Sequence, residues 1–143
     1  MEVELYFDNI DYDIDLVKYN SVIQKICKEL KLNIVSCNVV FVNDTKLSEM
    51  HEVYLNDPSP TDVITFNLGE EQIDGELYIS LERAIDHAQK YKVTIEEEIL
   101  RLIVHGILHL AGYEDLDDKN RVIMKQKEDK IVKHYYDFVR LIN

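Results

Sequence analysis

The stretch "HGILHLAGYED", residues 105–115, decides both the fold and the chemistry that this chain can support. It closes a long apolar run and places two histidines, His105 and His109, four residues apart. A buried imidazole needs a hydrogen-bond partner or a metal ion, because an unpaired polar group in an apolar setting costs roughly 1–3 kcal/mol. The surrounding residues indicate which of the two applies.

The segment from 95 to 111 is predicted to be a central, buried helix, because apolar residues occur on nearly every side of it. Thr94 and Glu97 form a T-x-x-E capping box at its start. Gly112 stands where a left-handed residue commonly ends a helix. Gly106 disfavours the helix by roughly 1 kcal/mol relative to alanine, so we expect it to permit the close approach of another element.

Hydrophobic periodicity and capping signals predict the remaining elements. The expected strands cover 3–7, 37–42, 62–68 and 76–81, and the expected helices cover about 16–32, 44–54, 82–91 and 118–141. The last two strands are predicted to form a hairpin. The order βαβαββααα predicts one α+β domain over residues 1–143, with helices packed on a mixed sheet.

Composition limits the possible functions of the chain. Its 143 residues carry a net charge of −12, which opposes nonspecific binding to nucleic acid or anionic lipid unless a local basic surface or a metal offsets it. The N-terminus has no signal-peptide pattern, and no apolar run approaches the roughly 20 residues of a membrane span. We therefore expect a cytoplasmic protein with no membrane association, in which Cys27 and Cys37 are reduced core thiols.

The spacing of the two histidines favours a metal site. Residues four apart share one face of a helix, so His105 and His109 can direct one nitrogen each to a single point. The alternative is a pair of core histidines bonded to backbone carbonyls. Asp115, ten residues after His105, stands where the long metalloprotease pattern H-E-x-x-H-x-x-G-x-x-H has its third ligand, and Glu114 beside it is the rival.

Two histidines and one carboxylate predict one catalytic zinc ion per chain. This ligand set leaves a fourth position open for water, whereas structural zinc sites are closed by four protein ligands. The peptidase pattern has its general base, a glutamate, directly after the first histidine, and here that position is Gly106. A zinc peptidase is therefore disfavoured.

The same eleven residues resemble the signature H-G-x-L-H-L-x-G-Y-D-H of the YbeY family, which are single-strand-specific endoribonucleases and ribosomal RNA maturation factors. Nine of the eleven places agree, the two wildcards included. Upstream, "PTDVITF" (60–66) is similar to the family's P-T-D-V-L-S-F, and "GELYISLERA" (75–84) is similar to its G-D-I-x-I-S segment. Size and element order also agree, so the resemblance covers nearly the whole chain.

Two departures from the family pattern concern the site. Asp115 replaces the family's third histidine, and Glu114 replaces its aspartate. The family also has a Tyr-Arg pair some six or seven residues before P-T-D, and the aligned pair here is Tyr54–Leu55. The resemblance therefore implies a zincin-like central helix with His105, His109 and Asp115 as metal ligands, but no catalytic arginine.

The resemblance implies a zinc-dependent endoribonuclease that acts on single-stranded RNA, in small-subunit (16S) ribosomal RNA maturation and ribosome quality control. Its partners would be ribosomal RNA and the small ribosomal subunit. The attacking group is either zinc-bound hydroxide or a deprotonated ribose 2′-hydroxyl, and the residues do not choose between them. A non-catalytic, zinc-stabilised ribosome-assembly factor is the second hypothesis, and a zinc peptidase is the third.

The other polar residues have simpler interpretations. His51, His87 and His134 are expected in solvated or core-edge positions on amphipathic helices. The acidic run 96–98 favours the helix dipole. Thr61 and Asp62 are either turn formers or residues near the site. Basic residues alternate with acidic ones over 118–134, which predicts a solvated helix face and a weak candidate RNA surface.

Overall fold

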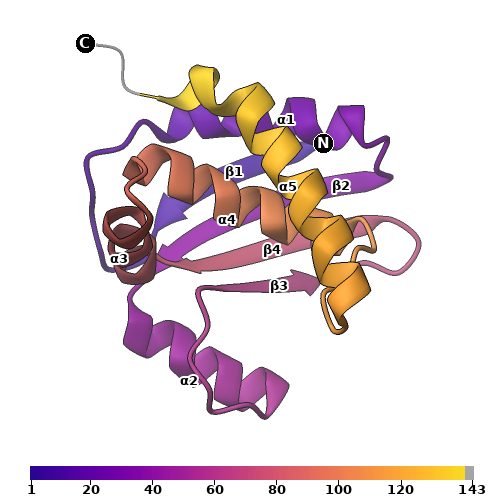
Figure 1. Cartoon of the computed structure of the whole chain (residues 1–143). Coiled ribbons are helices and arrows are strands. Elements are labelled where there is room, and N and C mark those ends of the chain that lie inside the picture. Colours follow the sequence, from indigo (N-terminus) through magenta and orange to yellow (C-terminus); the bar gives the residue numbers. More distant parts are fainter. Residues whose placement is uncertain (141–143) are drawn as a thin grey trace.

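The computed structural model describes residues 1–140, which form four strands and five helices (Figure 1). The elements in chain order are β1 (Glu2–Phe7), α1 (Leu16–Glu29), β2 (Ile34–Val42), α2 (Asp44–Leu55), β3 (Val63–Asn67), β4 (Ile73–Ser80), α3 (Leu81–Tyr91), α4 (Ile95–Leu110) and α5 (Asp118–Val139). The strand order is β1-β2-β4-β3, in which β3 alone runs antiparallel to its neighbour. The predicted α+β class, mixed sheet and β3–β4 hairpin are confirmed.

Helices cover the two faces of the sheet unequally. Helices α1, α4 and α5 lie over one face, while α2 lies on the other side beside β3 (Figure 1). Alternate residues of β2 separate the two cores, because Val39 and Phe41 join the large one and Val40 and Val42 the small one under α2. The larger core also buries Cys27 and Cys37, which are free thiols, and burial raises their pKa values to about 11 and about 12.

Some predicted boundaries were wrong. Helix α1 ends at Glu29 rather than near Leu32, because Lys31 adopts a left-handed conformation (φ 55°) and the Leu32 N–H closes the helix by donating to Cys27 O. Strand β2 begins at Ile34, where it pairs with the equally early start of β4. Helix α5 ends at Val139, and the predicted end at Leu141 lies outside the described residues. No helix within residues 1–140 has the length and apolar character needed to cross a bilayer.

Helix α4 is the central helix, as predicted, and Gly106 lets it lie close to the sheet. A Cβ atom at Gly106 would lie 2.5 Å from Leu77 Cδ2 on β4 and 3.2 Å from Thr65 Oγ1 on β3. Just after the last turn of α4, Gly112 has φ +99° and ends the helix. The Gly112 N–H donates to His109 O, and the Tyr113 N–H donates to Leu108 O. This paired closure turns the chain back across the end of α4.

Candidate metal centre

The last two turns of α4 and the turn that follows bring three metal-binding side chains together. His105 Nε2 and His109 Nε2 lie 3.2 Å apart. Asp115 Oδ2 lies 3.5 Å from His105 Nε2 and 3.7 Å from His109 Nε2. The tertiary structure thus groups the three residues that the sequence singled out. Glu114 is exposed and lies outside this group.

The second nitrogen of each imidazole is held by an acceptor. His105 Nδ1 lies 2.8 Å from Glu128 Oε1 on α5, and His109 Nδ1 lies 3.0 Å from the backbone carbonyl oxygen of Tyr113. A carboxylate and a carbonyl accept hydrogen bonds, so Nδ1 of each ring carries the proton. Each Nε2 is therefore unprotonated, and its lone pair is available to a metal ion placed between the two rings and Asp115.

The spacing of the three atoms suits a tetrahedral zinc ion. Metal–ligand bonds of about 2.0–2.1 Å in tetrahedral geometry place ligand atoms about 3.3–3.4 Å apart. The two histidine nitrogens, 3.2 Å apart, are already close to this spacing, and a small movement of Asp115 Oδ2 from 3.5 and 3.7 Å would complete it. The side chains of His105, His109 and Asp115 remain 28, 29 and 37% exposed, which leaves one side of the group open.

The charges around His105 favour a cation at this point. Burial lowers the pKa of His105, but the hydrogen bond and negative charge of Glu128, together with the charges of Asp115 and Asp62, outweigh burial and raise it. The same negative potential that favours a proton on the ring also favours a metal ion.

Glu128 is a residue beside the candidate ligands that sequence reasoning missed. It is 6% exposed, and besides His105 it accepts from Arg101 Nη1 at 2.9 Å, which in turn donates to Asp129 Oδ1 at 2.6 Å. Glu128 lies within a segment that we predicted to be a solvated helix face, and for this position that prediction was wrong. Glu128 lies four residues after Met124 and three before Ile131, on the apolar stripe of α5, and this spacing could have predicted that it is buried.

Two clefts meet at the candidate metal centre, and both include His105 and Asp115. The polar cleft, of about 490 Å³, lies toward β3 and is lined also by His109, Leu110, Leu55, Thr61, Asp62, Val63, Ile64, Thr65 and Asn67. The α5 cleft, of about 460 Å³, is lined also by Arg121, Val122, Met124, Lys125, Gln126 and Glu128. Asp62 and Thr61 therefore lie at the site, and Leu55 faces it from the end of α2.

The acidic run at the start of α4 does more than favour the helix dipole. Thr94 Oγ1 accepts from the Glu97 N–H, which confirms the cap, but Glu96 and Glu98 are buried. Glu98 Oε1 lies 3.7 Å from His87 Nδ1, and Asp62 Oδ2 is equally far from that nitrogen. His87 thus connects the buried start of α4 with the wall of the polar cleft.

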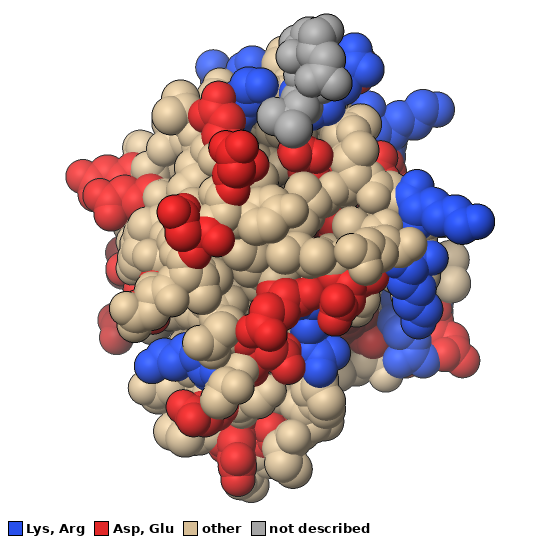
Figure 2. Space-filling model, turned by 90° about the vertical axis from the view of Figure 1, so that its left-hand side faces the viewer, with Lys and Arg blue, Asp and Glu red and all other residues tan. Residues whose placement is uncertain are grey.

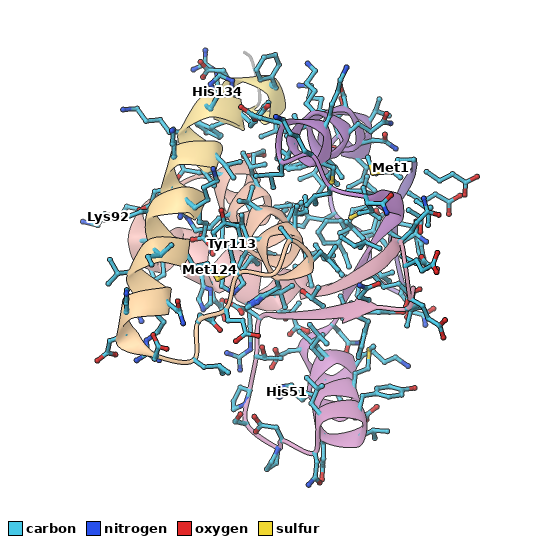
Figure 3. The ribbon with its side chains drawn as sticks, turned by 90° about the vertical axis from the view of Figure 1, so that its right-hand side faces the viewer. Met1, His51, Lys92, Tyr113, Met124 and His134 are labelled. Carbon is cyan, nitrogen blue, oxygen red and sulfur yellow. The ribbon has the colours of Figure 1, made fainter. Side chains whose placement is uncertain are left out.

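The other two histidines lie away from the centre. Figure 3 shows His51 on α2 and His134 toward the far end of α5, while Met124 and Tyr113 lie where α5 passes the end of α4. His51 Nδ1 lies 2.8 Å from the backbone oxygen of Ser59, and His134 stacks edge-on against Tyr135. Both agree with the predicted structural positions.

Charge is distributed unevenly over the molecule. Acidic side chains are spread across the face in Figure 2, whereas Lys and Arg side chains gather along its right-hand edge. Helix α5 holds six Lys and Arg against four Asp and Glu, in a chain whose net charge is −12. Two of the α5 cations, Arg121 and Lys125, line the α5 cleft beside His105.

Comparison with known proteins agrees with this structure. The family model described as endoribonuclease YbeY matches residues 6–136. Proteins named endoribonuclease YbeY from Flavobacterium psychrophilum and Chlorobium phaeobacteroides are 43% and 36% identical to the chain. The first alignment covers 69% of this chain and 71% of the relative, and the second covers 80% and 81%.

The fold also has a solved counterpart. A solution structure of a Thermotoga maritima protein superposes with a TM-score of 0.65 at 30% identity, covering 96% of this chain and 90% of that one. The family match spans both the helix that carries the histidines and the turn that carries Asp115. The chain belongs to the YbeY endoribonuclease family.

Proposed function

We propose that this protein is a zinc-dependent endoribonuclease that cleaves single-stranded RNA, with residues 1–143 forming one hydrolase domain built around a zincin-like helix, α4. We further propose a cytoplasmic role in the maturation of small-subunit (16S) ribosomal RNA and in ribosome quality control. The observation that carries the proposal is the convergence of His105 Nε2, His109 Nε2 and Asp115 Oδ2 in a member of an endoribonuclease family.

The protein side chains supply position and tautomer. His105, His109 and Asp115 would hold one zinc ion, while Glu128 and the Tyr113 carbonyl keep the two Nε2 lone pairs directed at it. When bound, zinc lowers the pKa of water to about 7 and polarises a phosphoryl oxygen. The exposed side of the group faces the two clefts, so a phosphodiester can approach from solvent.

Single strands are the expected substrate. Their backbone can bend into a cleft around a metal, whereas a paired helix holds its phosphates at fixed positions. A peptidase function is disfavoured, because Gly106 occupies the position of the peptidase base and has no side chain that could act as one. A Cβ atom at this position would lie 2.5 Å from Leu77 Cδ2, so the helix packs too closely on the sheet here for a larger residue.

A second candidate is a zinc-stabilised ribosome-assembly factor without catalysis. The observation that favours it is Leu55, an apolar residue that lines the polar cleft where the family has arginine. Without a cation there, that cleft provides less stabilisation for the charge of a phosphoryl-transfer transition state.

One experiment separates these functions. Zinc-loaded protein is incubated with end-labelled single-stranded RNA, duplex RNA or casein, each with and without a chelator. We expect slow cleavage of the single strand, little cleavage of duplex, none of casein, and loss of activity with chelator. No RNA cleavage together with intact binding to small ribosomal subunits would instead establish the assembly factor.

A further inference from the structure

The two clefts beside the candidate metal centre differ in charge. Among the described residues that line it, the polar cleft has two carboxylates, Asp62 and Asp115, and no lysine or arginine. The α5 cleft also has two carboxylates, Asp115 and Glu128, but it has two cations as well, Arg121 and Lys125. A phosphodiester held next to the metal needs positive charge for its remaining oxygens, so the α5 cleft is the favourable side for it.

Of the two cations, Arg121 is the better placed. Its Nη1 donates to the backbone oxygen of Asp115 at 3.4 Å, which puts the guanidinium beside the turn that carries the candidate ligand. Its ion-pair partner is Asp118, which is exposed. Lys125 Nζ, by contrast, lies 3.0 Å from Asp129 Oδ1 and 4.0 Å from Glu128 Oε2, so two carboxylates already offset its charge.

Arg121 has donors left for a phosphate. A guanidinium carries five N–H groups in a planar fork that matches phosphate oxygens, and the two contacts described do not use them all. Val122, which is exposed, gives the same cleft an apolar surface against which a base can lie. The volume of about 460 Å³ is within the range of about 300–1,000 Å³ that small-molecule sites occupy.

We propose that the α5 cleft is the phosphate subsite of this centre, and that Arg121 binds the phosphodiester adjacent to the metal. The proposal rests on the RNA-directed function proposed above.

The chain contains a matched control for Arg121. Arg140, at the end of the same helix, is 52% exposed against 54% for Arg121, and it pairs with Asp137 three residues before it as Arg121 pairs with Asp118. Arg140 lines neither cleft. Replacing either arginine by glutamine changes the net charge equally. A difference in RNA binding between the two variants therefore reflects where the arginine lies and not the overall charge of the protein.

The test measures binding of the zinc-loaded protein to a fluorescent single-stranded RNA whose 2′-hydroxyls are methylated, by anisotropy over a range of salt concentrations. Arg121→Gln should weaken binding about threefold to tenfold and lower the slope of log Kd against log salt by about 0.7, the value of one phosphate contact on a single strand. Arg140→Gln should leave both nearly unchanged. Asp118→Asn should tighten binding more than Asp137→Asn, because it releases Arg121. Zinc content should be equal in all four variants.

The outcomes separate this inference from the function on which it rests. Equal losses in Arg121→Gln and Arg140→Gln, or an unchanged salt slope in Arg121→Gln, would overturn the subsite while leaving the nuclease intact. Failure of the wild-type protein to bind or cleave any single strand would overturn both.

Discussion

His105 donates through Nδ1 to Glu128 Oε1 across 2.8 Å, and this bond joins residues 23 positions apart on two helices. It makes α5 part of the candidate metal centre, although none of the three proposed ligands comes from that helix. Arg101 holds the other carboxylate oxygen, so Glu128 is fixed on both sides. The orientation of His105 therefore depends on how α4 and α5 pack.

The histidines should account for most of the metal binding. Purified wild-type protein is expected to contain about one zinc per chain, because three convergent ligands suit one ion. His105→Ala and His109→Ala should each lose most of it, as measured by elemental analysis. Stoichiometric zinc in both variants would mean that the metal binds elsewhere.

The third ligand is predicted to be Asp115 rather than Glu114. Asp115 Oδ2 lies within 3.7 Å of both Nε2 atoms, whereas Glu114 is exposed. Asp115→Ala should weaken zinc affinity far more than Glu114→Ala in competition with a chromogenic chelator. Asp115→His should bind well, because imidazole is also a zinc ligand. The opposite ranking of the two alanine variants would assign the ligand to Glu114.

Glu128 should matter for zinc affinity although it does not touch the ion. Removing a carboxylate that orients a metal-binding histidine typically costs about 10–100-fold in affinity, and we expect Glu128→Ala to fall in that range. Glu128→Gln should lose less, because its amide oxygen can still accept from His105 Nδ1. Asp129→Ala is the control, since Asp129 shares Arg101 but not His105. Equal losses in Glu128→Ala and Asp129→Ala would show an effect of Arg101 alone.

Adding a cation at position 55 should speed RNA cleavage. Leu55 lines the polar cleft, so Leu55→Arg places a charge where it can stabilise the phosphorane-like transition state, and a roughly tenfold gain in kcat/KM corresponds to about 1.4 kcal/mol. Val53→Arg is the matched control, because Val53 is on the same helix but lines a different hollow beside Tyr78. A similar gain in both variants would indicate general electrostatic attraction of RNA.

Glu98 should make stability depend on pH. Burial raises its pKa above the ordinary 4.5, although His87 and Arg101 partly oppose this. Between pH 4.5 and the raised pKa, the folded state therefore binds more protons at Glu98 than the unfolded state does. The free energy of unfolding contributed by Glu98 consequently falls as the pH rises through this interval. Glu98→Gln should lose less stability over the same rise, measured by urea unfolding with chelator present in both proteins. Parallel curves would contradict this assignment.

The sequence by itself determined the local parts of the site. The spacing of His105 and His109, the cap at Thr94 and the stop at Gly112 depend on helix geometry within a few residues, so each was readable without tertiary information. The same holds for the order of strands and helices, which follows from periodicity. The boundary at Lys31 was missed because a left-handed residue other than glycine leaves no local signal.

Only the tertiary structure decided what surrounds the histidines. Glu128 looked like one more charge on a solvated helix, and it became a partner of His105 because α5 packs across α4. Leu55, Asp62 and Arg121 come from three separate segments and share the clefts at the centre through the arrangement of α2, β3 and α5. Contacts between residues distant in the chain depend on how faces pack, and a single sequence shows which residues form a face but not which face meets which.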